Sequence, residues 1–344
     1  MDFFKAIYDW IIGFFGVEEF IKIIKSGNYN SFLTYKGIVS ILGPLFPIIL
    51  VLEILMALVY RKFKAIDYKI SFFSYVLNSV IGRFISIAAI IFCIGVFEKY
   101  AVFKSTFTWY WFIYGYIVWE FGHFIYHYLG HKVRLFWCLH STHHAPRAMN
   151  LSVSYAHFFL EGPYADVIRT TVCILLGVSP PMLFVIMFID GFWGGFIHIG
   201  EHLVKNGKLG FLYKFILTPS HHRVHHAKNP LYMDTNFCNL LNIWDRVFRT
   251  YQPEEQDIAV EYGITRKMKP NSFIDSYFGE IGALVKDVGK APGIKNKILY
   301  IFMPPGWSHT GESNTAGKVR KEFMKNYSPS GSNRFVEKSP AKKE

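Results

Sequence analysis

Histidine is the residue type in this sequence that could do chemistry, because 13 of its 14 copies lie between positions 123 and 226 and only His309 lies outside. A neutral imidazole nitrogen is a good ligand for zinc, copper, iron or nickel, whereas hard cations prefer carboxylate oxygen. A single histidine is more often packed in a protein core than bound to a metal. The clustering, together with the spacing inside it, indicates a metal site.

Two histidine pairs have the spacing of one helical turn, in HYLGH at residues 127–131 and in HIGEH at residues 198–202. Side chains four residues apart lie on the same face of a helix, so both members of a pair can bind one ion. Each pair alone is only a weak indication of a metal site.

An HxxHH motif occurs twice, as HSTHH at residues 140–144 and as HRVHH at residues 222–226. Adjacent side chains on a helix diverge by about 100°, so His143 and His144 cannot easily bind the same ion. The repeated motif therefore predicts two metals. Together with the two pairs it supplies ten candidate ligands: His127, His131, His140, His143, His144, His198, His202, His222, His225 and His226.

The other histidines have weaker claims to ligation. His123 and His221 lie one turn before a candidate ligand, and we expect each to pack or to hydrogen bond beside the site. His157 is expected to line a substrate entrance or to cap a helix, and His309 to lie on the surface.

Acidic residues beside the motifs are candidates to orient the ligands, because a metal-bound imidazole normally donates its other N–H to a carboxylate or a carbonyl. An ordinary surface or capping role is the alternative for each. The candidates are Glu120, Glu161, Glu201, Asp234 and Asp245.

Composition indicates that the elements carrying these residues are membrane helices. Of the 344 residues, 51% are hydrophobic and 18% aromatic, and the mean hydropathy is +0.22. These values exclude a disordered chain and a coiled coil. The net charge of +12 fits nucleic acid or an anionic membrane surface, and the hydropathy favours the membrane, so we expect no nucleic-acid partner. Four scattered cysteines are expected to be free, packed thiols.

Two segments are long and apolar enough to cross a bilayer of roughly 30 Å, residues 38–60 and residues 72–97. Each contains one charge, Glu53 or Arg83, and these could pair with each other or reach an interface. The connecting loop RKFKAIDYK has four basic residues and one acid, which predicts a cytoplasmic position.

A third segment, from residue 107 toward residue 129, is expected to return to the cytoplasmic side with His127 at that end. The apolar region at residues 170–189 is split by Pro180-Pro181, which predicts a hairpin. Its second arm brings His198 and His202 to the same side. Remote histidines are thereby expected to meet at one membrane face.

The chain divides into five expected parts. Residues 1–36 suit a retained amphipathic interfacial helix, residues 37–106 hold transmembrane helices, and residues 107–260 hold the catalytic domain with its histidine motifs. Residues 261–310 form a C-terminal cytoplasmic segment. Residues 311–344, with eight basic and four acidic residues, are expected to be a disordered basic tail.

Residue types and spacing alone leave the metal open between iron and zinc. They also leave open a histidine-rich membrane metal transporter, a bis-histidine haem electron carrier and a di-zinc membrane hydrolase. A transporter would need ligands near the bilayer midplane, whereas most of the motifs lie in polar sequence. A haem carrier would need paired histidines on facing helices rather than two HxxHH motifs.

The stretch TPSHHRVHHAKNPLYMDTNFCNLLNIWDRVF at residues 218–248 resembles the third histidine box of the fatty acid hydroxylase superfamily, in particular its alkylglycerol monooxygenase-like branch. The resemblance extends back through Asn150-Leu151-Ser152, WCLHSTHH and HYLGH to Glu120. His198 also falls where the family has a histidine, whereas His202 matches the fatty acid hydroxylase members rather than the alkylglycerol branch. The chain departs from the family pattern at Tyr128, where arginine is common, and at Arg249, where glycine is common.

The resemblance implies an all-α integral membrane helical bundle whose cytoplasmic helical cap carries a histidine-rich dimetal site. It implies two non-haem irons bound by the ten histidines and an oxidoreductase of the monooxygenase type, which uses O2 to hydroxylate or desaturate a membrane lipid such as a fatty acyl chain, a sterol or an alkylglycerol. The chain has no CxxC, four-cysteine cluster or G-x-G-x-x-G motif. Electrons are therefore expected from a reduced pterin or from a cytochrome or ferredoxin partner.

Overall fold

The computed structural model describes residues 17–63, 65–269 and 272–327, together with Lys5, Tyr8, Asp9, Ile12 and Gly13. Within these residues the chain is helical, without β-strands, and two isolated β-bridges join loop segments. The longer helices are α2 (Glu18–Ser26), α3 (Tyr35–Val59), α4 (Ala65–Leu77), α5 (Arg83–Phe97), α6 (Trp109–Lys132), α7 (Arg134–His144), α8 (Glu161–Leu175), α9 (Pro180–Phe196), α12 (Phe273–Lys290), α13 (Gly293–Phe302) and α14 (Ala316–Asn326).

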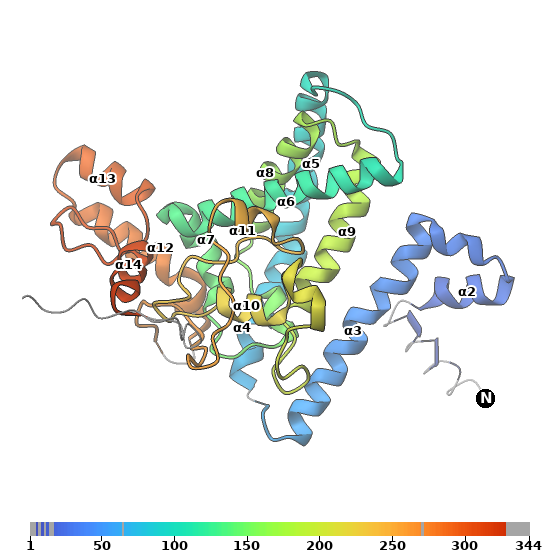
Figure 1. Ribbon diagram of the computed structural model, residues 1–344, viewed down its shortest axis with the longest axis horizontal. Helices are drawn as coiled ribbons and strands as arrows, with labels where there is room; N and C mark the ends of the chain where they lie inside the picture. The colour runs from blue at the N-terminus through green and yellow to red at the C-terminus, as the bar shows by residue number, and fades with distance from the viewer. Residues whose placement is uncertain are drawn as a thin grey trace, which may run out of the picture.

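Shorter elements connect these helices. They include the π-helix η2 (Asn78–Gly82), the helices α10 (Pro219–His225) and α11 (Ile243–Val247), and the 3-10 turns η1 (Tyr29–Leu33), η3 (Glu98–Tyr100), η4 (Leu151–Tyr155) and η5 (Gly210–Lys214). In Figure 1, α2 and α3 lie to the right, α12, α13 and α14 lie to the left, and α10 lies between them.

Two helical segments of the described chain are long and apolar enough to cross a membrane. They run over Lys36–Val59 and, through α4, η2 and α5, over Tyr68–Tyr100. The second contains the predicted span 72–97, and the first matches the predicted span 38–60 except at residue 60. Their surfaces carry large exposed apolar side chains: Phe84, Ile91 and Phe92 are 70%, 64% and 65% exposed. Such a surface is stable against lipid and is unfavourable in water, which indicates a membrane protein.

The helices α6, α8 and α9 pack against one another and form the main apolar core, which includes Trp119, Cys173 and Met182. Close approach is possible because glycine faces the neighbouring helix: a Cβ on Gly115 would lie 2.8 Å from Met182 Sδ. The predicted hairpin is present as α8 and α9, since Pro180 begins α9 instead of interrupting a longer helix. All four cysteines are buried and free, as expected.

Glu53 connects the first apolar helix to the rest of the protein. Its carboxylate is buried and accepts hydrogen bonds from the backbone N–H groups of Leu151 and Gly200, both at 2.7 Å. The acid is therefore satisfied by two backbone donors from distant segments, which resolves its role in the apolar span. Arg83, the other charge predicted inside a span, is exposed.

The two ends of the chain can be compared with the interfacial helix expected at residues 1–36 and the disordered tail expected at residues 311–344. Most of residues 1–16 lie outside the described residues, and the amphipathic segment that follows forms α2. In the tail expected to be disordered, α14 is a helix capped by Thr315, with Phe323 and Tyr327 packed near Val224. Contact with the core stabilises this helix, whereas composition alone predicts disorder. Residues 328–344 lie outside the described residues.

Candidate dimetal centre

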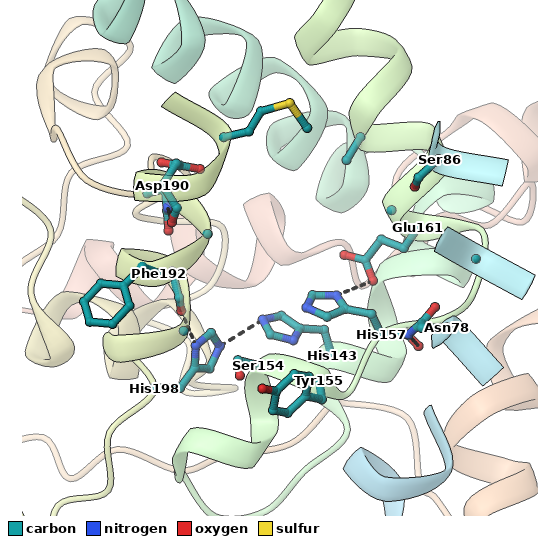
Figure 2. Close-up of a pocket in the computed structure, with 18 of the residues that line it drawn as sticks. Asn78, Ser86, His143, Ser154, Tyr155, His157, Glu161, Asp190, Phe192 and His198 are labelled. Atoms are coloured by element: carbon teal, nitrogen blue, oxygen red, sulfur yellow. Dashed lines mark hydrogen bonds and ion pairs between the residues drawn. The ribbon is translucent and has the colours of Figure 1, made fainter. Parts of the chain in front are cut away.

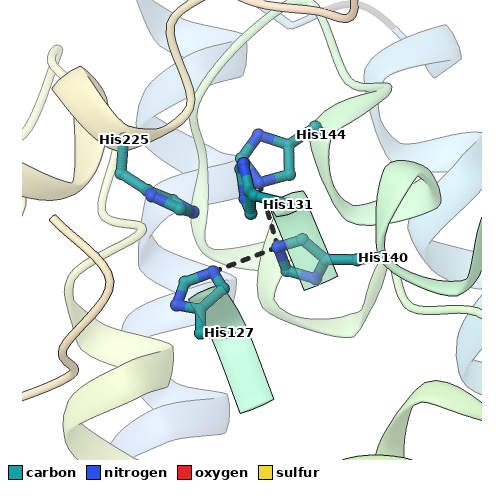
Figure 3. A group of neighbouring side chains, drawn as sticks. All are labelled: His127, His131, His140, His144 and His225. Carbon is teal, nitrogen blue, oxygen red and sulfur yellow. Dashed lines mark hydrogen bonds between the residues drawn. The ribbon is translucent and has the colours of Figure 1, made fainter. Parts of the chain in front are cut away.

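Nine of the ten candidate ligands converge into two groups of buried histidines. One potential ligand nitrogen from each member lies within 4.8 Å of those of all other members of its group. Figure 3 shows the larger group around a common centre. Group A contains His127, His131, His140, His144 and His225, and group B contains His143, His198, His222 and His226.

Three helices supply group A. His127 and His131 lie one turn apart near the end of α6, and His140 and His144 lie one turn apart on α7, so each helix presents two imidazoles on one face. His225, at the end of α10, completes the group from a segment about eighty residues further along the chain. The rings of His127 and His225 lie only 4.3 Å apart between centroids.

Group B draws on α7 and α10 as well, and on the turn after α9. His143 comes from α7, and His198 comes from the turn that follows α9. His222 and His226 lie one turn apart on α10 and its C-terminal cap. The two groups are direct neighbours, since the rings of His144 and His226 stack with centroids 4.4 Å apart.

Both adjacent histidine pairs are divided between the groups. His144 belongs to group A and His143 to group B, and likewise His225 belongs to group A and His226 to group B. This division follows from the divergence of neighbouring side chains on a helix. Each HxxHH motif therefore contributes to two binding positions at once.

Backbone carbonyls set the orientation of three rings. The Nδ1 of His127 lies 2.8 Å from the carbonyl oxygen of Phe237, and the Nδ1 of His225 lies 2.8 Å from that of Thr235. The Nδ1 of His198 lies 2.6 Å from the oxygen of Gly194. A carbonyl only accepts, so each Nδ1 carries the proton and each neutral ring turns an unprotonated Nε2 toward its group.

The inward nitrogens fit a bound cation and do not fit hydrogen bonds with one another. The Nε2 atoms of His127 and His140 are 3.0 Å apart, and both rings carry their proton on Nδ1, which faces the Phe237 carbonyl in one and Glu161 in the other. Two nitrogen lone pairs at such a distance repel unless a cation lies between them. The buried Nε2 atoms of His131 and His225 have no hydrogen-bond partner. All donors are imidazole nitrogens, which suits iron or zinc and disfavours magnesium or calcium.

Burial keeps the ligands neutral. It lowers the pKa of His131 to about 4 from the ordinary 6.5, with Asp234 partly opposing the shift. Burial also lowers the pKa of His144, His225 and His226 well below 6.5, and the neighbouring imidazoles add to the effect. Neutral imidazole is the form that binds metal, so the site is ready for metal at neutral pH.

Two of the predicted acids contact the histidines directly. Glu161 Oε1 accepts from His140 Nδ1 at 2.6 Å, and its Oε2 accepts from His157 Nδ1 at 2.8 Å. Burial raises the pKa of Glu161, but His157 and His140 outweigh it and lower the pKa to about 2. Asp234 Oδ1 lies 3.4 Å from His131 Nδ1, and Lys132 forms an ion pair with its other oxygen. Both acids are therefore anionic acceptors that orient group A.

Two other predicted acids do not contact a histidine of either group. They hold the loop at residues 237–241, where the carbonyl of Phe237 accepts a hydrogen bond from His127. Asp245 accepts from the backbone N–H groups of Phe237 and Cys238 at 2.8 and 2.9 Å. Glu120 accepts from the N–H groups of the next three residues, at 2.6–3.0 Å. The fifth candidate, Glu201, lies on the surface and accepts from Tyr262 instead.

His202 lies outside both groups. The helix α9 ends at Phe196, so His198 and His202 are not on one continuous helix, and the spacing of one turn does not place them together. The Nε2 of His202 lies 3.4 Å from the carbonyl oxygen of Glu53.

The remaining histidines also lie outside the groups. His221 Nε2 contacts the hydroxyl of Tyr251 at 2.8 Å, and its ring completes the cap of α10. His309 contacts the hydroxyl of Tyr300 at 2.9 Å. His123 Nδ1 lies 3.7 Å from Asp190.

A cavity of about 800 Å³ leads from the apolar helices to the histidines. Its outer wall includes the exposed side chains of Tyr75 and Arg83, and its inner wall includes the buried rings of His143 and His198. Figure 2 shows His157 beside His143 within this space, and the two rings stack with centroids 4.1 Å apart. The volume suits a ligand of lipid or drug size.

Some parts of this site have no signal in the sequence. The carbonyls of Gly194, Thr235 and Phe237 orient three ligands, but a backbone carbonyl is the same for every residue type. Arg169 also lines the cavity, stacked on the rings of Trp119 and Tyr126, and no motif singles it out.

The structure combines two helical segments that could cross a membrane with two groups of histidines that could each hold a metal ion. Residues 112–250 match the fatty acid hydroxylase family. The chain is 30% identical over 192 residues to the alkylglycerol monooxygenase of Xenopus tropicalis, covering 55% of this chain and 40% of the relative. It is 29% identical over 220 residues to the human alkylglycerol monooxygenase, covering 62% and 46%.

A third relative is the ornithine lipid hydroxylase OlsE of Rhizobium tropici, which is 26% identical over 154 residues, or 45% of each chain. No solved structure matches the chain. The chain spans less than half the length of these curated relatives. Residues 112–250 thus resemble the fatty acid hydroxylase family, and the chain is similar to alkylglycerol monooxygenases.

Proposed function

We propose that the protein is a membrane-bound non-haem di-iron oxygenase that uses O2 to hydroxylate or desaturate a lipid. The observation that carries the proposal is the cavity, which joins the exposed apolar helices to both histidine groups. The names of the relatives, two alkylglycerol monooxygenases and an ornithine lipid hydroxylase, support lipid as the substrate class.

Groups A and B would each hold one iron, and the two irons would supply O2 activation and oxidation of a C–H bond. The chain's own residues position those ligands. Glu161 and Asp234 hold rings of group A, and the Phe237 carbonyl holds His127. Buried apolar walls exclude water, and the cavity aligns one carbon of the lipid, where an error of about 1 Å can cost a hundredfold in rate.

We place the active site on the cytoplasmic face of a multi-pass protein. Support comes from the start of α4, next to the basic loop at residues 61–69. There Ile70 packs against Ala145 and Ala156, and Ser152 donates to the hydroxyl of Ser71 at 3.2 Å. The positive-inside rule puts that loop in the cytoplasm, so the histidines beside it face the same side. Electrons would come from a reduced pterin or from a cytochrome or ferredoxin partner.

The test is lipidomics of cells with and without the protein under 18O2. We expect a lipid labelled with one 18O atom, or an unsaturated lipid, only in cells with the wild-type protein. The His144→Ala variant, present in the membrane at the same level, serves as the control. Product formation by that variant, or identical lipids in both cultures, would contradict the proposal, and metal analysis showing zinc without iron in an active protein would favour a hydrolase.

A further inference from the structure

Of the charged residues that line the cavity, all but one have a polar side-chain partner. Glu161 is bound by His140 and His157, and Arg169 donates to Asp166 at 2.7 Å. Asp190, the second acid in the wall, accepts from the Tyr116 hydroxyl at 3.4 Å and lies near His123. Arg83 is the remaining charged residue of the lining, and it has no acidic partner within the residues that the structure describes.

Arg83 occupies an unusual place for an unpaired cation. It lies inside the apolar segment Tyr68–Tyr100, directly after the π-helix η2. An ionisable residue within a membrane span is costly and is commonly functional, and π-helical turns are frequent at functional sites. The unpaired charge is therefore expected to meet a partner that the protein chain does not supply.

The depth of Arg83 suits the headgroup of a lipid. The opposite end of α5 is followed by an exposed ion pair of Glu98 with Lys104 at 3.3 Å. This ion pair indicates that the opposite end of α5 lies in solvent, outside the apolar core of the membrane. The 15 residues of α5 separate Arg83 from this end by about 22 Å, most of a core of roughly 30 Å. A long arginine side chain near the other boundary reaches the level of the lipid phosphates.

The wall around Arg83 offers further polar groups on the same helical face. Asn78, Ser79 and Ser86 line the cavity within five residues of Arg83. Asn78 already donates to the carbonyl of His157 at 3.0 Å, whereas the serine hydroxyls remain as donors. Figure 2 shows Ser86 and Asn78 along the wall that also carries Glu161 and His157. A guanidinium fork binds two oxygens of a phosphate, and neighbouring hydroxyls can donate to the remaining oxygens.

We propose that Arg83 binds the phosphate of a glycerolipid whose chain enters the cavity toward the histidines. The cavity extends from Arg83 to the rings of His143 and His198, so a lipid bound by its phosphate at Arg83 would extend its chain toward the histidines. This inference rests on the proposed function for its meaning, since it names the substrate class of the same site. Binding can nevertheless be measured without turnover.

The test is native mass spectrometry of the metal-loaded protein in detergent micelles, titrated with dioleoyl phosphatidic acid or with dioleoylglycerol of the same chains. We expect Arg83→Gln to bind phosphatidic acid about tenfold more weakly or worse, because a charge-assisted hydrogen bond is lost. Binding of dioleoylglycerol should not change. Arg83→Lys should lose less, and Lys99→Gln, at the far end of the span, should match the wild type.

Wild-type binding of phosphatidic acid by Arg83→Gln would overturn the inference, as would an equal loss of dioleoylglycerol, which would indicate a damaged cavity. Full displacement of phosphatidic acid by millimolar inorganic phosphate would assign the site to free phosphate instead. The His144→Ala variant separates this inference from the proposed function. It should lack turnover but bind phosphatidic acid normally, since His144 does not line the cavity.

Discussion

Glu161 offers the sharpest test of how the protein holds its metals, because one carboxylate serves two imidazoles. In Glu161→Gln one carboxylate oxygen becomes an NH2 group, which donates and cannot accept from an imidazole N–H. At most one of the two hydrogen bonds, at 2.6 Å to His140 and 2.8 Å to His157, survives, and the negative charge is lost in either case. The change conserves volume, so the packing of α8 should persist.

The expected magnitude follows from the hydrogen bond to His140. A hydrogen bond to a charged group contributes about 1.5–3 kcal/mol, which corresponds to a factor of about 10–100 in binding. Loss of a carboxylate that supports a metal-bound histidine costs about the same factor in metal affinity. We therefore expect a loss of about 10–100-fold at group A, with a smaller effect at group B, which contacts Glu161 only through the stacked ring of His157.

The assay is metal content by mass spectrometry after equilibration with graded concentrations of a chelator. Wild-type protein should release metal from two sites, and Glu161→Gln should shift the release from one of them to lower chelator concentration. Glu201→Gln is the matched control, because that acid contacts Tyr262 and no histidine. Release curves for Glu161→Gln that coincide with those of the wild type would refute the assigned role of the carboxylate.

Three further predictions concern individual ligands and pH. We expect His143→Ala and His144→Ala each to lower the metal content toward one per chain and to abolish oxygenation, while the protein stays in the membrane. Metal analysis and turnover measure these effects. Two tightly bound metals in either variant would contradict the grouping. His202→Ala should retain both metals and at least about half of the wild-type turnover, since its ring lies outside both groups, and a turnover below a tenth would show that it contributes to the site. The metal-free protein should lose stability as the pH falls from 6.5 toward 4, because burial holds the pKa of His131 at about 4 while the unfolded chain takes up its proton near 6.5. Thermal unfolding in detergent at pH 7.5 and pH 5 checks this, and an equal midpoint at both values would contradict it.

The sequence predicts much of the site because short-range helical geometry decides it. The spacing of His140, His143 and His144 on one helix separates the adjacent pair whatever the surrounding fold, and the structure places His143 and His144 in different groups. Apolar length likewise predicts α3 and the α4–α5 segment, since a span needs only enough hydrophobic residues in sequence.

Other parts of the structure depend on contacts that no local pattern encodes. Where α9 stops decides whether His202 faces His198, and the turn after Phe196 depends on Glu53, which binds Gly200 from 147 residues away. The helix α14 forms in a polar segment because Phe323 finds an apolar surface on the core. Neither partner can be identified from the neighbouring sequence, because the contact forms only when the whole chain has folded.

The division of each adjacent histidine pair between the two groups has a mechanical consequence. Consecutive Cα atoms are fixed about 3.8 Å apart by covalent bonds, whereas packed helices can slide by an ångström or more during thermal motion. One peptide unit on α7 and another on α10 therefore act as two rigid spacers between the neighbouring coordination spheres. If each group holds an ion, these two spacers limit how far the ions can move apart when the helices shift.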